Sequence, residues 1–210
     1  MKHQDFSSKK ILCLGSSVTF GTGSNGVSFA DMLNEYCGAE VHKHAVGGTT
    51  LADNSSDSYV SRLLSECKDI PALDYVLVQL STNDAGRGNT LGCVSPEPLS
   101  ADLSVYDRQT VVGAIEFIIK YAKDRWHCPV GFYTGTKFQS EPYEKMVAAL
   151  LQVKEKWHIG VLDLWSDPEM LSVSPEDYQK YMKDPVHPSL EGYRDWWLPK
   201  FEAFLAKEME

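Results

Sequence analysis

Three side chains of the kinds that perform acyl transfer stand out in the sequence. Ser17 follows directly on the apolar run 10–15, which is typical of a buried strand. A serine hydroxyl is a weak nucleophile unless a neighbouring base removes its proton. His187 is the candidate base, because Asp184 precedes it by three residues in the stretch KDPVHPS. A carboxylate at that spacing can hold one imidazole nitrogen and leave the other nitrogen free to act as the base.

The turn that carries His187 has two interpretations. Pro185 and Pro188 keep its backbone out of a continuous helix. In one interpretation, Asp184 orients the imidazole for catalysis. In the other, Asp184 caps a helix that begins near Ser189 and His187 is an ordinary polar turn residue. The spacing alone leaves both open.

Acyl transfer also needs hydrogen-bond donors for the negative charge that develops on the carbonyl oxygen. The stretch AVGGTT places Gly47 and Gly48 after the second apolar run, where their backbone can approach a ligand closely. The stretch LSTND ends the third run with Asn83, whose amide donates without carrying a charge. Taken singly, the glycines fit a simple tight turn, and Asn83 with Asp84 fits a polar strand exit. Their common placement after strands favours one shared site.

The elements that must position these residues alternate between strands and helices. Apolar runs typical of strands cover residues 10–15, about 40–45, 75–80, 130–134 and 160–164, and helical apolar spacing covers 29–36, 111–122, about 142–157 and about 189–207. This alternation predicts right-handed crossovers and a parallel sheet covered on both faces, which is a doubly wound α/β domain. Ligands bind such sheets beyond the carboxyl ends of the strands, where the candidate residues lie.

Length, composition and charge limit the remaining possibilities. The 210 residues are 43% hydrophobic, which supports a sizeable core and a single domain over 1–210. The formal net charge of −9 disfavours nucleic acid or an anionic membrane surface as the main partner, because both select clustered Lys and Arg. We therefore expect a small-molecule ester substrate. The sequence does not indicate an oligomeric state.

The spacing of the cysteines, the apolar runs and the histidines predicts the cellular compartment of the protein and whether it binds a metal. The five cysteines show no CxxC spacing, and we expect them to be reduced. No apolar run is typical of a signal or a membrane span, which predicts a cytoplasmic protein, although a chain whose signal had been removed would look the same. His42 and His44 alternate along a strand without a Cys or acidic partner at ligand spacing. We therefore expect no metal site and no cofactor.

The motifs GSSV, AVGGTT, STND and DPVHP, in this order, resemble those of the SGNH (GDSL-like) hydrolases over nearly the whole chain. The resemblance implies a flavodoxin-like three-layer α/β/α sandwich with a central five-stranded parallel sheet. It implies a serine esterase in which Ser17 attacks the ester carbonyl to form an acyl-enzyme intermediate, His187 transfers the proton and Asp184 orients His187. It also implies an oxyanion hole made by the backbone N–H groups of Ser17 and Gly48 and by the Asn83 side chain.

Two positions depart from the family's usual motifs. Ser16 stands where the family has an Asp beside the nucleophile, and Ser81 stands where it has a Gly two residues before Asn83. The first change leaves open which hydrogen bonds shape the nucleophile's turn, and it makes Ser16 an alternative nucleophile. Ser17 is favoured because it occupies the family's position and the side chains of a strand alternate in direction.

Two other functions are compatible with parts of the sequence. The Gly- and Ser-rich stretch GSSVTFGTGSNG could cradle a phosphate, but it has no GxxxxGK[ST] motif, no GxGxxG in register with the strand and no Lys. A non-catalytic ligand- or carbohydrate-binding module on the same fold is the remaining alternative. The segment 83–106 is longer than an ordinary connection and rich in Gly, Pro and Ser, which indicates a functional loop or lid.

The substrate class rests on the loop residues. Polar side chains in the predicted loops are compatible with a small, polar acylated substrate, including a carbohydrate: Asn54, Asp84, Arg87 and Asn89. Aromatic residues could form a hydrophobic or sugar-stacking wall, although such residues more often belong to the core: Phe20, Tyr106, Tyr133, Phe138 and Trp196. No extended apolar surface segment is visible, which disfavours a true lipase.

Overall fold

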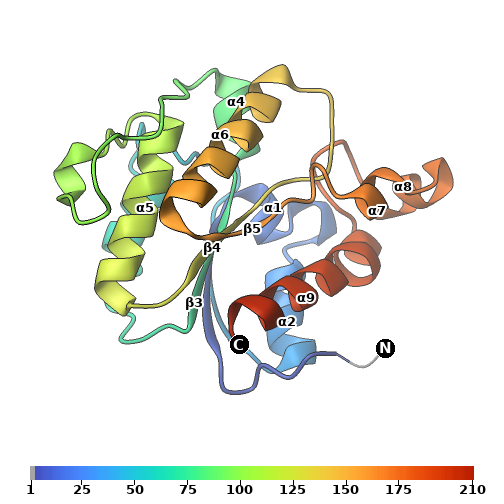
Figure 1. Ribbon diagram of the computed structural model, residues 1–210. Coiled ribbons are helices and arrows are strands. Elements are labelled where there is room, and N and C mark those ends of the chain that lie inside the picture. Colours follow the sequence, from blue (N-terminus) through green and yellow to red (C-terminus); the bar gives the residue numbers. More distant parts are fainter. Residues whose placement is uncertain (1–2) are drawn as a thin grey trace.

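A five-stranded parallel sheet forms the centre of the protein in the computed structural model, which describes residues 3–210 (Figure 1). The strands are β1 (Lys10–Gly15), β2 (Glu40–Ala45), β3 (Tyr75–Gln79), β4 (Val130–Tyr133) and β5 (Gly160–Leu162). Their order is β2-β1-β3-β4-β5, and every neighbouring pair is parallel. The predicted sheet is confirmed, with β3, β4 and β5 one or two residues shorter than expected. The topological switch point lies between β1 and β3, so this fold favours a ligand site beside Ser17.

Helices connect the strands. They are α1 (Ser17–Phe20), α2 (Phe29–Cys37), α3 (Tyr59–Ser65), α4 (Thr82–Arg87), α5 (Val111–Trp126), α6 (Glu141–Trp157), α7 (Pro168–Leu171), α8 (Pro175–Tyr181) and α9 (Leu198–Glu208). The segments Thr22–Ser24 and Leu103–Val105 are 3₁₀ turns, and a π-helical segment, Gly192–Trp197, leads into α9. The predicted helices over 29–36, 111–122, 142–157 and 189–207 are confirmed. The shorter helices α3, α4, α7 and α8 were not predicted, because each is too short to show a full apolar period.

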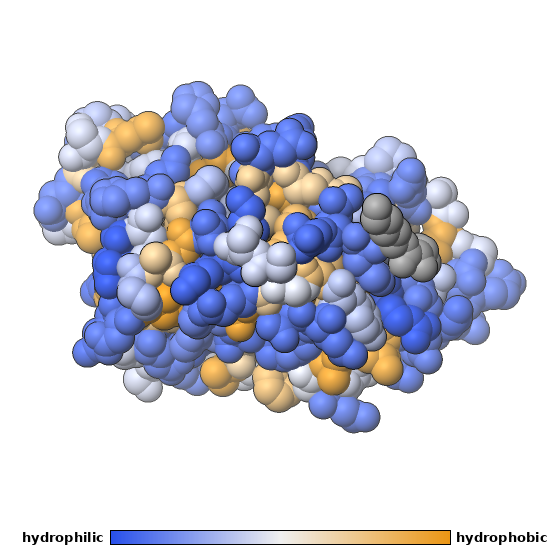
Figure 2. Space-filling model, turned by 90° about the horizontal axis from the view of Figure 1, so that it is seen from below, coloured by the Kyte–Doolittle hydropathy of each residue, from blue (hydrophilic) through white to orange (hydrophobic). Residues whose placement is uncertain are grey.

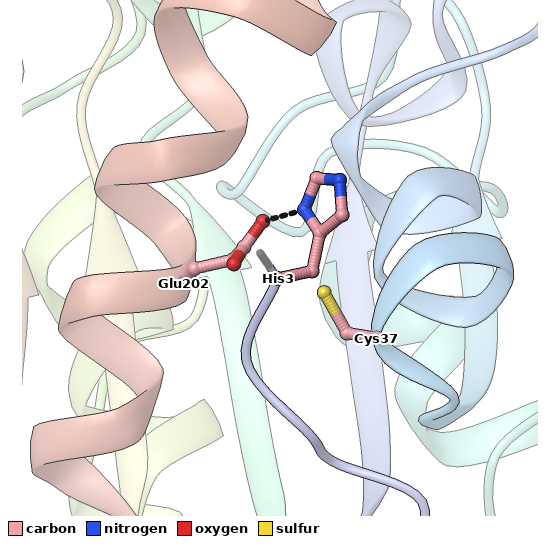
Figure 3. A group of neighbouring side chains, drawn as sticks. All are labelled: His3, Cys37 and Glu202. Atoms are coloured by element: carbon pink, nitrogen blue, oxygen red, sulfur yellow. Dashed lines mark hydrogen bonds and ion pairs between the residues drawn. The ribbon is translucent and has the colours of Figure 1, made fainter. Parts of the chain in front are cut away.

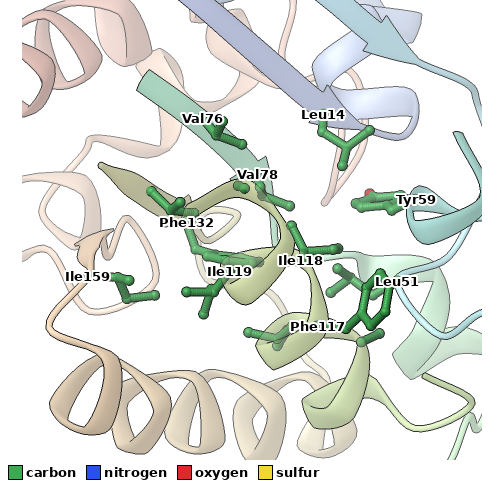
Figure 4. Close-up of a cluster of buried hydrophobic side chains, with 14 of the residues drawn as sticks. Leu14, Leu51, Tyr59, Val76, Val78, Phe117, Ile118, Ile119, Phe132 and Ile159 are labelled. Atoms are coloured by element: carbon green, nitrogen blue, oxygen red, sulfur yellow. The ribbon is translucent and has the colours of Figure 1, made fainter. Parts of the chain in front are cut away.

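The helices form two layers around the sheet, giving the predicted three-layer α/β/α sandwich (Figure 1). Helices α3, α5 and α6 pack on one face and α2 and α9 on the other. Both faces of β1 are buried: Leu12 and Leu14 belong to the first core, and Ile11 and Cys13 to the second. This double burial explains why the strand is a continuous apolar run rather than an alternating one. Figure 4 shows part of the first core, where Ile118 and Ile119 of α5 meet the sheet.

The segment 83–106 packs along α5 and α6 after its first turn, which is α4. The backbone N–H of Ser95 donates to Glu116 Oε2 (2.8 Å), and Lys156 Nζ donates both to Ser95 O (2.7 Å) and to Glu116 Oε1 (2.7 Å). Glu116 is fully buried, so this ion pair fixes the middle of the segment to the two helices. These contacts do not support the interpretation of the segment as a lid.

The surface and the cysteines give two further findings. Among residues 3–210, no helix has the length and apolar character needed to cross a membrane. On the face seen in Figure 2, hydrophobic residues are scattered among hydrophilic ones. All five cysteines are free thiols: Cys13, Cys37, Cys67 and Cys128 are buried and Cys93 is exposed.

Candidate active site

Ser17, His187 and Asp184 form a continuous hydrogen-bonded chain. Ser17 begins α1, directly beyond the carboxyl end of β1, and is 8% exposed. His187 Nε2 lies 2.8 Å from Ser17 Oγ, and His187 Nδ1 lies 2.7 Å from Asp184 Oδ2. The fold therefore brings together a hydroxyl and an imidazole that are 170 residues apart in the sequence. This arrangement provides a nucleophile, a base and a group that orients the base.

The turn around His187 is held by Asp184. Its Oδ1 accepts hydrogen bonds from the backbone N–H groups of Val186 (2.8 Å) and His187 (2.9 Å), while Oδ2 contacts the imidazole. The alternative role of Asp184 as a helix cap is not observed, because Ser189 Oγ accepts from Gly192 N (3.0 Å) at the start of the last helix. Asp184 therefore fixes both the backbone and the ring of His187.

The carboxyl of Asp184 is kept ionised by its contacts. Partial burial opposes ionisation, but the hydrogen bonds from Val186 and His187 outweigh it, so the pKa of Asp184 lies below its usual value. An ionised Asp184 accepts the Nδ1–H of His187 and leaves Nε2 without a proton, which is the tautomer that can act as a base toward Ser17.

Gln79 shapes the turn that presents Ser17. Its Oε1, at the end of β3, accepts from Ser16 N (2.9 Å) and Thr19 Oγ1 (2.9 Å) and lies 3.3 Å from both Ser16 Oγ and Thr19 N. The resemblance left open which hydrogen bonds shape this turn when Ser16 replaces the family's Asp. In this protein, Gln79 Oε1 accepts them. Ser16 is fully buried with its hydroxyl directed to Gln79, whereas Ser17 contacts His187. The geometry therefore favours Ser17 over Ser16 as the nucleophile.

Close contacts between distant segments hold His187 beside α1. A Cβ built on Gly23 would lie 2.3 Å from Pro188 O and 3.2 Å from His187 Cβ, so only glycine allows this approach. The hydroxyl of Tyr193 donates to Val18 O (2.6 Å), which links the last helix to α1. The carboxyl-terminal part of the chain thereby sets the position of the imidazole.

The three predicted oxyanion donors lie on three segments: Ser17 begins α1, Gly48 lies in the loop after β2, and Asn83 lies in α4. Asn83 Nδ2, in the first turn of α4, donates to Thr49 O (2.9 Å), which connects it to the loop that carries Gly48. Gly48 has φ = 80°, a left-handed conformation that favours glycine. A Cβ on Gly47 would lie 3.9 Å from Ser17 Cβ, so this loop also contacts the serine. The loop therefore adjoins both Ser17 and Asn83.

The substitution of Ser81 for the family's glycine adds contacts that support Asn83. Ser81 Oγ accepts from Asn83 N (3.2 Å) as the N-cap of α4, and it also lies 3.3 Å from Thr49 O. A glycine would make neither contact. Ser81 therefore fastens α4 to the Gly48 loop.

Asp84 is a structural residue, contrary to the expectation that it faces a substrate. It is fully buried, and its carboxylate accepts from Leu51 N (2.7 Å), Ala52 N (3.1 Å) and Asn89 Nδ2 (2.8 Å). A buried carboxylate with three donors is satisfied and has little capacity left for a ligand. Asp84 and Asn89 therefore leave the set of candidate substrate contacts.

Arg62 is a buried residue near the site that the sequence analysis did not identify. Its Nη2 donates to Gly15 O (2.7 Å) and to Thr49 Oγ1 (3.1 Å), and its guanidinium is 1% exposed. It thus joins the carboxyl end of β1 to the Gly48 loop. No local pattern marks Arg62 as a buried arginine in the short helix α3, whereas Gln79 was detectable as a lone polar residue in the apolar run YVLVQL.

Three of the five aromatic residues pack in or against the core, which is the placement that the sequence favoured over a wall beside the site. Tyr133 and Tyr106 are 0% and 3% exposed and belong to the core. Phe138 packs against Tyr143 and Trp165. The two remaining residues are accessible: Phe20 is 44% exposed and lies under the ammonium of Lys43, and Trp196 stacks on Tyr181.

Comparisons with known proteins agree with this fold and its motifs. The model of the GDSL-like Lipase/Acylhydrolase family matches residues 13–194. None of the curated proteins matches the sequence. A solved structure of a protein from Lactobacillus plantarum is 23% identical with a TM-score of 0.78, and the match covers 98% of this chain and 99% of that one.

Two solved esterases share the fold. An acetyl xylan esterase from Geobacillus stearothermophilus is 15% identical with a TM-score of 0.64, over 100% of this chain and 97% of that one. A family two carbohydrate esterase from Clostridium thermocellum, solved in complex with cellohexaose, is 14% identical with a TM-score of 0.66, over 96% of this chain and 64% of that one. At these identities the similarity is one of fold.

Proposed function

Because the chain belongs to the GDSL-like lipase/acylhydrolase family and is a carboxylic ester hydrolase, we propose that Ser17, His187 and Asp184 are its catalytic triad. We further propose that it removes short acyl groups from a small, polar, carbohydrate-like alcohol. The observation that carries the proposal is the pair of hydrogen bonds that Ser17 Oγ donates to His187 Nε2 (2.8 Å) and His187 Nδ1 donates to Asp184 Oδ2 (2.7 Å).

The proposed reaction has two halves. His187 Nε2 accepts the proton of Ser17 as its Oγ attacks the ester carbonyl, and the imidazolium then gives that proton to the departing alcohol. Water, deprotonated by His187, attacks the resulting acyl-serine and releases the carboxylic acid and free Ser17. Asp184 stabilises the imidazolium in both halves and stays ionised throughout.

The negative charge of each tetrahedral intermediate requires donors near the carbonyl oxygen. We assign this role to the backbone N–H groups of Ser17 and Gly48 and to Asn83 Nδ2. The Asn83 amide has two hydrogens, of which one is donated to Thr49 O (2.9 Å) and the other remains for the substrate. The bond to Thr49 fixes the direction of the second hydrogen before the substrate arrives, and preorganised donors of this kind are the most effective.

Replacing Asn83 by alanine should lower kcat by about 10²- to 10³-fold, because one oxyanion donor is lost. KM should change much less, since the charge develops only in the transition state. The measurement is steady-state hydrolysis of p-nitrophenyl acetate. Gln152→Ala, at an exposed side-chain amide of α6, is the matched control and should keep the original rate. An Asn83→Ala enzyme of unchanged kcat would remove Asn83 from the oxyanion hole.

The surroundings of the Gly48 loop support a polar substrate. Arg87 Nη2 donates to Gly48 O (2.6 Å), and its side chain is exposed. Thr22 Oγ1 lies 4.0 Å from a Cβ built on Gly47. Polar groups of this kind favour hydroxyl-bearing substrates over long hydrocarbon chains. The acetyl xylan esterase and the carbohydrate esterase with this fold act in the same chemical class, which adds support.

A hollow beside the His187 turn could receive the alcohol part of the ester. It has a volume of about 350 Å³, and Tyr178 and Trp196 line it together with Lys137. The backbone carbonyl of Tyr178 accepts from Met182 N (2.9 Å), and Met182 pairs with Pro188, the residue after His187. Aromatic faces beside a lysine suit a ring that has both apolar C–H groups and hydroxyls.

Hydrolysis of p-nitrophenyl esters should be fastest for acetate and should fall as the acyl chain lengthens, because polar groups surround the carbonyl site. The measurement is kcat/KM for the acetate, butyrate, octanoate and palmitate esters. Preference for the long chains would contradict the substrate class while leaving the triad intact. Absence of hydrolysis of every ester would instead favour the non-catalytic binding module.

A further inference from the structure

Three side chains with metal-ligand chemistry meet near the amino ends of the strands. His3 precedes β1, Cys37 ends α2 just before β2, and Glu202 lies in α9. Figure 3 shows the three side chains converging from these three segments. Their ligand atoms all lie within 4.8 Å of one another. Ser17 follows the carboxyl end of β1, so this cluster is separate from the candidate active site.

The cluster is buried and charged. Cys37 and Glu202 are 3% and 7% exposed. Glu202 Oε1 lies 2.6 Å from His3 Nδ1, and Glu202 Oε2 accepts from Gln4 N (2.9 Å). Burial, and then the charge of Glu202, raise the pKa of the Cys37 thiol to about 12. Within residues 3–210, His3 is the one ion-pair partner of Glu202, so this buried carboxylate forms no ion pair with an arginine or lysine there.

We propose that His3 Nδ1, Cys37 Sγ and a Glu202 carboxylate oxygen bind one Zn²⁺ ion, with water as the fourth ligand. Zn²⁺ accepts sulfur, imidazole nitrogen and carboxylate oxygen together, whereas Ca²⁺ and Mg²⁺ prefer oxygen alone. The Cys37 thiol loses its proton to solvent on binding. The thiolate and the carboxylate then balance the two charges of the ion, so the buried site becomes neutral.

The observed positions need only small changes to reach zinc geometry. Tetrahedral coordination at normal bond lengths places the ligand atoms roughly 3.3–3.8 Å apart. The contact between His3 and Glu202 would lengthen from 2.6 Å, and the longer separations in the cluster would shorten. His3 can make this adjustment because its side chain is 33% exposed and stacks only on Tyr36 among aromatic residues.

A cavity adjoining the cluster provides space for the water ligand. It has a volume of about 330 Å³ and is lined by His3 and Glu202. Arg194 also lines it, but its guanidinium donates two hydrogen bonds to Asp195 (2.7 and 2.8 Å), and it forms no ion pair with Glu202 within residues 3–210. A catalytic zinc also keeps one open position, yet no nucleophile of the proposed triad lies here, so we assign this ion a structural role.

The proposed ion would fasten the amino-terminal segment to α2 and α9. Phe6 N donates to Cys37 O (2.7 Å), and Gln4 N donates to Glu202 Oε2 (2.9 Å). These hydrogen bonds hold the amino-terminal segment next to two of the proposed ligands. By contrast, His42 pairs with Glu40 (3.2 Å) and His44 with Glu66 (3.0 Å), and neither pair belongs to a cluster of three such ligands in the described part of the chain. The expectation that the chain binds no metal rested on those two histidines alone.

The test uses the full chain freed of metal by a chelator, with Zn²⁺ or Co²⁺ added alone. Zn²⁺ at about 100 times its Kd should raise Tm by roughly 5–10 °C, because it binds the folded chain selectively. Co²⁺ should give a sulfur-to-cobalt charge-transfer absorption with a stoichiometry of one. Both signals are independent of ester hydrolysis, so failure here leaves the proposed function untouched.

Three variants identify the ligands. Cys37→Ser should abolish the charge-transfer band and the Zn²⁺-dependent rise in Tm, while Cys93→Ser, at the exposed cysteine, should keep both. His3→Gln changes a partly exposed residue and should weaken Zn²⁺ binding at least about tenfold without unfolding the chain. The proposal is overturned if the native chain shows neither signal, which would leave a hydrogen-bonded cluster only. It is equally overturned if Cys37→Ser binds Co²⁺ as the native chain does.

Discussion

Replacing Ser17 by alanine is expected to lower kcat by at least about 10⁴-fold, the scale of loss when a serine nucleophile is removed from a triad. The reason is chemical: within residues 3–210, Ser17 Oγ is the one hydroxyl hydrogen-bonded to the His187 ring, at 2.8 Å from its Nε2. The fold should survive, because alanine is smaller and Ser17 is not a helix cap. The measurement is hydrolysis of p-nitrophenyl acetate, with circular dichroism to verify folding.

Ser16→Ala is the matched control for this prediction. Ser16 Oγ makes a 3.3 Å contact with Gln79 Oε1, while the stronger 2.9 Å bond to Gln79 comes from the Ser16 backbone, which alanine retains. The Ser16→Ala enzyme should therefore keep most of its activity. Loss of turnover in Ser16→Ala together with its survival in Ser17→Ala would exchange the roles of the two serines.

Replacing His187 by alanine is expected to cost about as much as replacing Ser17, because the hydroxyl then has no base. The two residues act as one unit, so the Ser17→Ala/His187→Ala double variant should be no slower than either single variant. The measurement is kcat for the three variants, purified in parallel to exclude traces of native enzyme. Losses that multiply in the double variant would mean that the two side chains act independently.

His42→Ala is the control for the histidine. His42 lies on β2 of the same sheet and pairs with Glu40 (3.2 Å), which is half exposed. It has no contact with the triad among the described hydrogen bonds, so its removal should leave kcat unchanged within about twofold. A loss comparable to that in His187→Ala would indicate that kcat responds to the stability of the fold rather than to the base.

The architecture could be predicted because its signals are local and repeated. Strand β1 is apolar on both faces, and α5 carries Ile115, Ile118 and Ile119 at helical spacing. Each of these patterns lies within one element, so it is visible without knowledge of partners. The limits of β3, β4 and β5 were less accurate, because an apolar residue just beyond a strand, such as Leu80, is buried in the same core as the strand.

The candidate site was predictable in its reacting groups but not in its supports. Ser17, His187 and Asn83 each stand in a short motif after a strand or between prolines. Arg62 and Asp84 work through bonds to backbone groups of other segments, such as Gly15 O and Leu51 N. A partner of this kind is defined only by the tertiary structure. The same reason hid the cluster of His3, Cys37 and Glu202, whose members have no common spacing.

Tyr133 shows how a core residue can reach the site. It ends β4 and is fully buried, with its hydroxyl 2.6 Å from Thr19 Oγ1. Burial strongly raises the pKa of this phenol, so the hydroxyl remains protonated. Through this contact with Thr19, Tyr133 stabilises the turn after β1 from the side of the core. An aromatic side chain with one polar atom can serve a core or a surface equally well, and the sequence does not distinguish them.

The most direct test of the triad is covalent labelling with a fluorophosphonate, followed by proteolysis and fragment sequencing. Such a reagent reacts with a serine whose proton a neighbouring base removes. We expect one label per chain, on Ser17 and not on Ser16, and we expect no label in the His187→Ala variant. A chain that hydrolyses esters while its label lies on another residue, or while Ser17 stays unmodified, would contradict the assignment of Ser17 and His187 as nucleophile and base.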